Sequence, residues 1–354
     1  MLGIIDKVLS LFDNRKLACE VGYQMDNPNF LPALRRYAGQ VTDVYFSIPG
    51  DPTYYGAWGV KEEMEWKSIF VSFLKDLDEI RSMGISAIVC VDASCYGANY
   101  ASEILMKHIA EMLSIVSEHI HIKAVTTSSF PFAECLRKIC SSLKIRASEG
   151  MHLTCVRQLS FTRNLFNGYY IGHEAVRDLE EIERMRKWCD DNGKTLHIMP
   201  NNACLYRCPY YLYHGNIQSH AQEFMLAKDK IDTPMDKPAP CEHILVKDEN
   251  RDLILKGMWI RPEDMRHVSY YFDSMRLATR TNKNPQNIIK AYCEEKWDGN
   301  LCDILEAMHD HSAVFPVLRN DRFPKDWFKK TSRCGHRCES CHYCKDVLKT
   351  VVSG

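Results

Sequence analysis

Seven of the 16 cysteines gather in the C-terminal half of the chain, among Pro, Gly, His and Tyr residues. In the first group, Cys204 and Cys208 are spaced C-x₃-C, and Cys241 follows in a proline-rich loop. Thiols at this spacing on a turn can face one metal ion or cluster, and a proline directly after a cysteine is common at iron–sulfur sites. This group predicts a [4Fe–4S] cluster. The alternatives are zinc, with His214 and His220 as further donors, and the packing of buried thiols.

The second group is Cys334, Cys338, Cys341 and Cys344, spaced C-x₃-C-x₂-C-x₂-C. Four thiolates can enclose one [4Fe–4S] cluster or one structural zinc ion. We therefore expect one or two clusters in the protein, with zinc at the C-terminal motif as the alternative. The first three cysteines also match the radical S-adenosylmethionine triad. Those enzymes carry the triad after their first barrel strand, however, so its position here disfavours that chemistry.

Composition and charge favour a cytoplasmic protein without membrane partners. The net charge is -1, and no apolar run approaches the roughly 18 residues that span a bilayer. The amphipathic N-terminal residues 1–16 lack a small-residue cleavage site. In a reducing compartment clustered cysteines favour metal binding over disulfides. Cysteines that lie singly in apolar contexts are instead expected to be buried: Cys90, Cys135, Cys140, Cys155, Cys189, Cys293 and Cys302.

Two carboxylates and one histidine are candidates for proton transfer. Glu20 and Glu149 lie at the ends of predicted strands, in the segments ACEVG and ASEG. A carboxylate at such a position can act as a general acid or base. His214 follows the first cysteine group and is the third candidate, with a simple polar capping role as its alternative.

Three arginines are candidates for substrate binding. Arg177 opens a helix after a strand, Arg261 lies in a proline-flanked turn, and Arg280 ends the last predicted strand. Guanidinium groups near a barrel rim would suit a carboxylate-rich substrate, because they bind carboxylates with two parallel hydrogen bonds. Surface charges or ion pairs at helix ends are the alternative for each of them.

Short β-branched segments alternate with helical patterns along most of the chain. Residues 178–192 show the clearest helical stripe, and Asn284 followed by Pro285 is typical of a helix start. Eight such units predict an α/β fold, a TIM-like (β/α)₈ barrel over residues 1–315, with an open doubly wound sheet as the alternative. Residues 316–354 are expected to form a short cysteine-rich, metal-binding extension with a helix over 346–352. The predicted strands are Leu17–Gly22, Val41–Ile48, Ala87–Asp92, Ile122–Thr127, Lys144–Ala147, Tyr169–Ile171, Leu196–Met199 and Tyr270–Ala278.

Several motifs resemble the collagenase-like peptidase family, family U32. They are YIGHEAVRDLEEI at 170–182, NNACLYRCP at 201–209, WIRPED at 259–264 and RLATR at 276–280, followed by Ala291 and Tyr292. The resemblance covers residues 17–305, with Arg276 and Thr279 in place of the family's lysine and glycine. It implies a TIM-like barrel whose [4Fe–4S] cluster is held by four scattered cysteines, with Cys204, Cys208 and Cys241 as matching ligands. It also implies oxygen-independent hydroxylation of RNA bases or of a quinone precursor, in some relatives with prephenate as the oxygen donor.

The first functional hypothesis is therefore an iron–sulfur barrel enzyme. It would carry out a redox or oxygen-independent hydroxylation-type modification of a small molecule, a peptide or a nucleic acid. Its partners would be an anionic substrate or oxygen donor and an electron-donor protein. The alternative is a non-catalytic iron–sulfur component that transfers electrons to, or stabilises, a partner enzyme. A peptidase ranks third, because the sequence offers no convincing nucleophile–base pair and no H-E-x-x-H motif.

Overall fold

The structure is a computed structural model that describes residues 16–49, 63–220, 240–306 and 317–352. The amphipathic N-terminal segment lies outside the described residues, apart from Lys16. None of the helices in the described ranges is long and apolar enough to cross a membrane.

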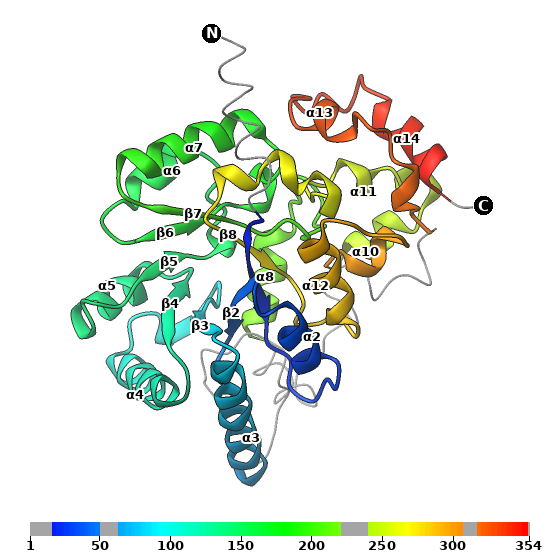
Figure 1. Ribbon diagram of the computed structural model, residues 1–354. Coiled ribbons are helices and arrows are strands. Elements are labelled where there is room, and N and C mark those ends of the chain that lie inside the picture. The colour runs from blue at the N-terminus through cyan, green and yellow to red at the C-terminus, as the bar shows by residue number, and fades with distance from the viewer. Residues whose placement is uncertain (1–15, 50–62, 221–239, 307–316, 353–354) are drawn as a thin grey trace, which may run out of the picture.

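Eight parallel strands close into a barrel in the order in which they occur along the chain (Figure 1). The closing pair joins β1 to β8, with Glu20 opposite Arg276 and Val21 opposite Leu277. This confirms the predicted (β/α)₈ fold and excludes the open doubly wound sheet. The strands are β1 (Ala18–Gly22), β2 (Val41–Phe46), β3 (Ser86–Val91), β4 (Ile122–Thr127), β5 (Ile145–Ala147), β6 (Gly168–Tyr170), β7 (Thr195–Ile198) and β8 (Ser274–Leu277).

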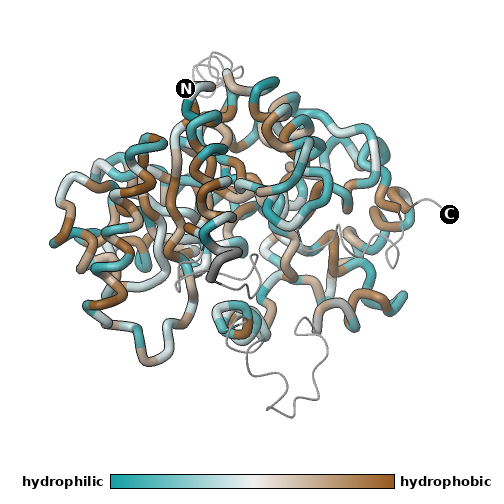
Figure 2. Tube along the Cα trace, turned by 90° about the horizontal axis from the view of Figure 1, so that it is seen from below, coloured by the Kyte–Doolittle hydropathy of each residue, from teal (hydrophilic) through white to brown (hydrophobic). Residues whose placement is uncertain are grey.

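Helices follow the strands and cover the outside of the barrel. In α7 the Asp178 side chain caps the helix by accepting a hydrogen bond from the Glu181 N–H at 3.2 Å, and Ile182, Met185 and Cys189 face the strands. Seen from below, the outer helices carry both hydrophilic and hydrophobic residues, as expected for helices between a sheet and water (Figure 2). These helices are α2 (Phe30–Tyr37), α3 (Glu63–Ser82), α4 (Glu103–His119), α5 (Phe130–Ile139), α6 (Val156–Phe161), α7 (Leu179–Asp191) and α12 (Pro285–Glu294).

The connection between β7 and β8 is much longer than the others. It carries the loop of Cys204 and Cys208, then α8 (Tyr211–Ser219), α10 (Pro240–Leu245) with Cys241, and α11 (Leu253–Lys256). Because this connection starts where β7 ends, its first residues lie at the carboxyl ends of the strands, where barrel enzymes hold their active sites.

The C-terminal segment packs on this long connection. Its helix α14 (Tyr343–Val351) lies beside α11, and α13 (Trp327–Thr331) precedes it in the chain (Figure 1). The Trp327 ring stacks on Trp259 with 6.2 Å between ring centroids, and Leu318 pairs with Val352 in a short β-bridge. The aromatic contact therefore fixes the segment to the long connection, and the β-bridge ties the two ends of the segment to each other.

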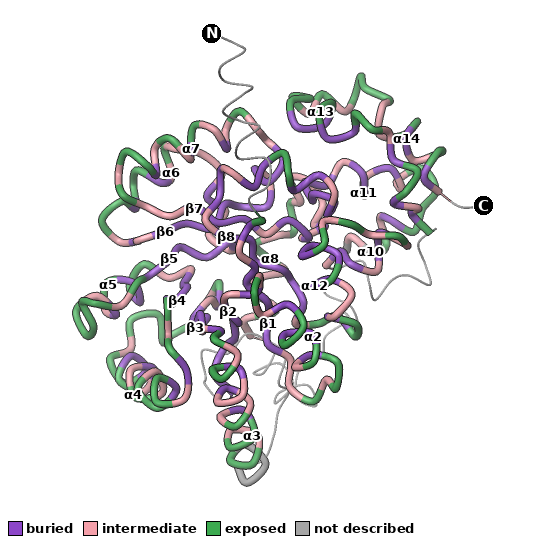
Figure 3. Tube along the Cα trace, viewed as in Figure 1, coloured by how far each residue is buried: buried purple, intermediate pink, exposed green. Residues whose placement is uncertain are grey.

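The strands are the most deeply buried part of the molecule (Figure 3). None of the 16 cysteines forms a disulfide. Of those predicted to be buried, Cys90, Cys189, Cys293 and Cys302 are buried, and Cys135 and Cys155 are half-buried. The prediction is wrong for Cys140, which is exposed at the end of α5.

Candidate active site at the carboxyl ends of the strands

A buried ion network fills the inside of the barrel around Glu20. Side chains of alternate strand residues point inward, so partners from distant strands meet there. The Glu20 carboxylate lies 2.9 Å from Arg146 Nη1 and 3.4 Å from Arg276 Nε, and it accepts hydrogen bonds from Tyr170 and Ser274. Burial alone would raise the pKa of Glu20, but Arg146 and Arg276 hold it well below its usual range. Glu20 therefore stays ionised, which argues against a general-acid role; its two buried arginines make it a structural partner in this network, and a role as a base stays a prediction.

Arg276 is the residue of this network that reaches toward the carboxyl ends of the strands. Its guanidinium carbon lies 3.8 Å from the Tyr170 ring centroid and 4.5 Å from that of Tyr45. Nη1 is 4.0 Å from Asp92 Oδ2, whereas Nη2 and Asp92 Oδ1 are buried without a hydrogen-bond partner among the described residues. A buried N–H without a partner costs free energy, so Nη2 is a donor ready for a ligand.

Arg280 lies next to this group, at the strand end where the sequence placed it. A Cβ atom on Gly22 would come within 2.5 Å of Arg280 Cγ and 3.0 Å of the Tyr45 ring, so only glycine leaves room for the arginine to cross β1. The Arg280 guanidinium carbon lies 5.5 Å from the Tyr45 ring centroid. Burial raises the pKa of Tyr45 to about 12, although Arg280 and Arg276 both act to lower it. Two cations thus flank one neutral phenol at the barrel mouth.

A second polar cluster surrounds Glu149, directly after β5. Its carboxylate accepts hydrogen bonds from Tyr211 Oη at 3.1 Å and from Asn202 Nδ2 at 3.3 Å, and it lies 3.5 Å from His173 Nδ1. The His152 ring meets the Tyr211 ring edge-on with 3.6 Å between centroids. Residues that follow β5, β6 and β7 are thereby brought together, as expected for loops that meet at one end of a barrel.

In this cluster the carboxylate stays ionised, and the two histidines have pKa values shifted in opposite directions. Burial would raise the pKa of Glu149, but the contact with His173 lowers it, so the carboxylate stays ionised. Burial would lower the pKa of His173, but Glu149 raises it, whereas burial lowers the pKa of His152. Nε2 of each imidazole has no hydrogen-bond partner in the described part of the chain. The sequence reasoning missed both histidines, although His173 stands three residues after β6, where the strand-end rule applies.

The first cysteine group adjoins the Glu149 cluster. The Cys204 N–H donates a hydrogen bond to Asn202 Oδ1 at 3.0 Å, and Asn202 also binds Glu149. Burial raises the pKa of the Cys204 thiol, and the charges of Glu149, Cys241 and Cys208 raise it further, so the three thiols are neighbours. Across the described residues, no three His, Cys, Asp or Glu side chains converge closely enough to hold a metal ion in this conformation. The chemistry of this soft donor set fits an iron–sulfur cluster, but the side chains as placed do not meet at one metal.

Glu306 connects the cysteine loop with the arginine pair. Its backbone N–H donates to the Asn201 carbonyl at 2.8 Å, and its Oε1 accepts from Thr281 Oγ1 at 2.6 Å, next to Arg280. The Glu306 charge acts on both the Tyr45 hydroxyl and the Cys204 thiol. The two arginines, Arg276 and Arg280, and the first cysteine group therefore border one region at the barrel mouth.

Sequence comparison finds a relative that spans most of the chain. An uncharacterized protease of Methanocaldococcus jannaschii is 30% identical over 297 residues, which cover 81% of this chain and 83% of that protein. The chain belongs to the U32 peptidase family. A solved U32 peptidase is similar at 14% identity, covering 73% of this chain and 91% of its own, with a TM-score of 0.49. An enolase family member from Agrobacterium tumefaciens covers 58% of this chain and 52% of its own, at 14% identity and a TM-score of 0.30. No protein-family model matches the chain.

In this U32 barrel, Arg177 does not face the mouth. Its side chain is buried, with Nη1 donating to the Trp259 carbonyl at 3.3 Å and Nη2 to the Leu255 carbonyl at 3.1 Å. The guanidinium carbon lies 5.7 Å from the Trp259 ring centroid and 5.3 Å from that of Trp327. The expectation of substrate binding is corrected here, because the donors of Arg177 are used between the barrel and the C-terminal segment.

Arg261 and His214 also lie away from the arginine pair of the U32 barrel. Arg261 forms two hydrogen bonds to Asp264, at 2.7 Å and 3.0 Å, and a third to the Asn320 carbonyl, so it fastens the C-terminal segment instead of binding substrate. His214 lies on α8 with Nε2 at 3.1 Å from Gln218 Nε2. One turn earlier on this helix, it is Tyr211 that reaches Glu149, so the structure does not support the catalytic role predicted for His214.

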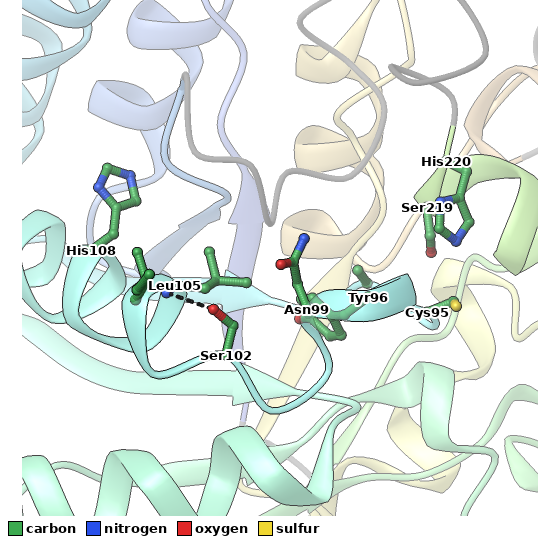
Figure 4. A pocket seen from close by; sticks show the side chains of 10 residues that line it. Cys95, Tyr96, Asn99, Ser102, Leu105, His108, Ser219 and His220 are labelled. Carbon is green, nitrogen blue, oxygen red and sulfur yellow. Dashed lines mark hydrogen bonds between the residues drawn. The ribbon is translucent and has the colours of Figure 1, made fainter.

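A separate pocket of about 460 Å³ lies between the start of α4 and the end of α8 (Figure 4). Ser102 caps α4 at its edge by accepting a hydrogen bond from the Leu105 N–H at 3.2 Å. None of the lining side chains is Asp, Glu, Lys or Arg, so the pocket lacks the fixed charge that the arginine pair provides. The pocket is lined by Ala93, Cys95, Tyr96, Asn99, Ser102, Ile104, Leu105, His108, Ser219 and His220.

Proposed function

We propose that this U32 protein is an iron–sulfur barrel enzyme that binds an anionic substrate, or an anionic oxygen donor, at Arg276 and Arg280. The reaction would be a redox or oxygen-independent hydroxylation-type modification of a small molecule, a peptide or a nucleic acid. The observation that carries the proposal is the buried Arg276 Nη2, which has no partner in the described part of the chain. It lies in the region that Glu306 connects to Cys204.

In this proposal, each group of side chains has a separate role in binding, proton transfer or cluster ligation. Arg276 and Arg280 would orient a carboxylate through charge-assisted hydrogen bonds, while Glu20 keeps Arg276 in position from below. His173 would donate or accept a proton, because its Nδ1 lies 3.5 Å from the Glu149 carboxylate and its Nε2 has no hydrogen-bond partner among the described residues. Cys204, Cys208 and Cys241 would hold the cluster. A bound [4Fe–4S] cluster supplies electron transfer and, where one iron lacks a protein ligand, Lewis acidity.

A peptidase is the second candidate, because the M. jannaschii relative is named a protease. The Glu149–His173 pair resembles the acid–base half of such a site. Its Nε2, however, binds no Ser, Thr or Cys side chain of the described residues, so the nucleophile is missing there. The non-catalytic alternative is an iron–sulfur protein that transfers electrons to a partner enzyme. It would be favoured if the protein held clusters but did not bind an anion at the arginine pair.

Anaerobic isolation followed by iron and acid-labile sulfide counts tests the proposal. The protein should be brown, and Cys208→Ser should lose iron and sulfide, because serine oxygen is a poor ligand for soft iron–sulfur centres. The matched control is Cys140→Ser, which changes an exposed thiol far from both groups and should keep all iron. A Cys208→Ser protein with the same iron and sulfide content as the wild type, or a colourless wild-type protein that cleaves peptides, would contradict the proposal.

A further inference from the structure

Arg177 is a buried cation without a carboxylate partner. Its side chain is among the largest fully buried ones, and it forms no ion pair with a described residue. Two of its nitrogens bind backbone carbonyls, and Nε has no partner among the described residues. The nearest carboxylate that acts on it, Asp264, is already paired with Arg261 at 2.7 Å. A buried charge strongly destabilises a fold unless a counter-charge accompanies it, so a missing anion is expected nearby.

The second cysteine group lies where that anion is needed. Trp327, which packs on the Arg177 guanidinium, stacks on Tyr343 with 5.9 Å between ring centroids, and Cys344 is the next residue. Burial lowers the pKa of Arg177, whereas the Cys344 and Cys334 thiols, and after them Asp264, act to raise it. Thiolates at these positions would supply the counter-charge.

The four cysteines lie within eleven residues of the chain, on a sharply turned stretch of backbone, although their side chains do not converge on one point in this conformation. Gly335 and His336 both have positive φ, at 65° and 52°, which turns the chain sharply between Cys334 and Cys338. Burial raises the pKa of the Cys344 thiol to about 11; Arg177 acts to lower it, and the other three thiols act to raise it further. Cys334 and Cys341 are exposed, so their side chains can rotate onto a metal without disturbing the core.

A second cation, Lys256, lies at the end of α11. Burial would lower its pKa, but Asp252 raises it, and Cys338 and Cys344 add to that effect. The Lys256 ammonium pairs with Asp252 at 2.9 Å, so part of its charge is already balanced. Both the barrel loop that carries Arg177 and the β7–β8 connection that carries Lys256 thus present positive charge to the four thiols.

We propose that Cys334, Cys338, Cys341 and Cys344 hold a metal centre of their own as thiolates, with the buried Arg177 as its counter-charge. Zn²⁺ and a [4Fe–4S] cluster both give a net negative charge when four thiolates bind them, and both fit this donor set. The centre is independent of the one proposed at Cys204, so each can fail without the other.

Metal analysis of the full-length protein tests the ligands. The double variant Cys338→Ser/Cys341→Ser should lose one zinc ion, or one cluster's iron and sulfide, while the metal lost in Cys208→Ser remains; Cys140→Ser should lose nothing. Zinc loss identifies a zinc site, and joint loss of iron and sulfide identifies a cluster. If the double variant keeps all its metal, or loses the Cys208-dependent metal as well, the separate centre is excluded. If the double variant loses metal and Cys208→Ser loses none, the result supports this centre and contradicts the proposed function.

Competition with a chelator tests the counter-charge. In the Cys208→Ser background, Arg177→Gln should weaken metal binding about 10–100-fold, the range for partners of metal ligands, whereas Arg177→Lys should keep most of the affinity. Lys256→Gln is a second test, because Lys256 is only half-buried and its replacement should disturb the fold less. Lys349→Gln, at an exposed position on α14, is its matched control. Wild-type affinity in both Arg177→Gln and Lys256→Gln would overturn the assignment of a counter-charge.

Discussion

Tyr206 stacks on His336 with 4.1 Å between ring centroids and 21° between ring planes. Tyr206 lies between Cys204 and Cys208, and His336 lies between Cys334 and Cys338. This one contact joins the two cysteine loops, which are more than a hundred residues apart in the sequence. The C-terminal segment is thereby fixed against the loop that borders the barrel mouth.

Removal of the Tyr206 ring should loosen the C-terminal cysteine loop. Tyr206→Ala is expected to cost about 0.5–1.5 kcal/mol beyond its lost buried area, the range for an aromatic pair. Amide hydrogen exchange over residues 333–344 should become faster. Tyr206→Phe keeps the ring and serves as the control. Equal exchange in Tyr206→Ala and wild type would show that the stack does not hold the loop.

The arginine pair should bind small carboxylates. Arg280→Lys is expected to weaken binding of a tricarboxylate such as citrate by about 1.5–3 kcal/mol, because lysine keeps the charge and loses the planar donor pair. Titration calorimetry measures the change. Arg35→Lys, in an exposed pair with Glu79, provides the control and should bind like wild type. If Arg280→Lys binds the carboxylate as tightly as the wild type, Arg280 is not part of the anion site.

Glu20 should stabilise the barrel through its charge. Glu20→Gln leaves Arg146 and Arg276 without their buried partner and should cost about 3–5 kcal/mol of unfolding free energy at neutral pH. The pKa of Glu20 is held below its ordinary value of 4.5, so its contribution is complete above pH 4.5 and is lost as the pH falls through the lowered value. Denaturant unfolding at neutral and acidic pH tests this, with exposed Glu111→Gln as the control. A Glu20→Gln protein of wild-type stability would contradict the network.

The two histidines beside Glu149 should titrate on opposite sides of the ordinary value of 6.5, with the pKa of His173 above it and that of His152 below it. His173 therefore adds stability that is complete below pH 6.5 and is lost as the pH rises through its raised pKa. Ring NMR signals followed against pH measure both values. Glu149→Gln removes the carboxylate and should lower the pKa of His173. If that pKa stays unchanged in the variant, Glu149 is not its cause.

The strands could be predicted because each has a local signature. β4 has the predicted bounds, Ile122–Thr127, and the others begin or end within two residues of prediction, except at the start of β8. There the predicted strand began at Tyr270, but residues 269–271 form a 3₁₀ turn and β8 begins at Ser274. Aromatic residues favour strands and also fill tight turns, so the apolar pattern alone could not separate the two.

The site was predicted less well, because position along a strand does not give a side chain's direction or partners. Arg280 and Glu149 lie at the mouth as expected. Arg177 follows a strand in the same way, yet it turns under Trp327, a contact with a residue far away in the sequence. Glu20 is at the right place, but its two buried arginines, which come from β5 and β8, fix it as an ionised partner. Only the three-dimensional arrangement reveals those pairings.

Arg177 belongs to the barrel by its place in the chain and to the C-terminal segment by its surroundings. A hybrid that joins this barrel to the C-terminal segment of a cysteine-free homologue would leave the guanidinium beneath a neutral, apolar cover. Such a hybrid should fold poorly unless Arg177 is replaced at the same time by an uncharged residue of similar length, such as methionine. The junction between the two parts is therefore a poor place to recombine natural sequences, even though the barrel's strands close without the segment.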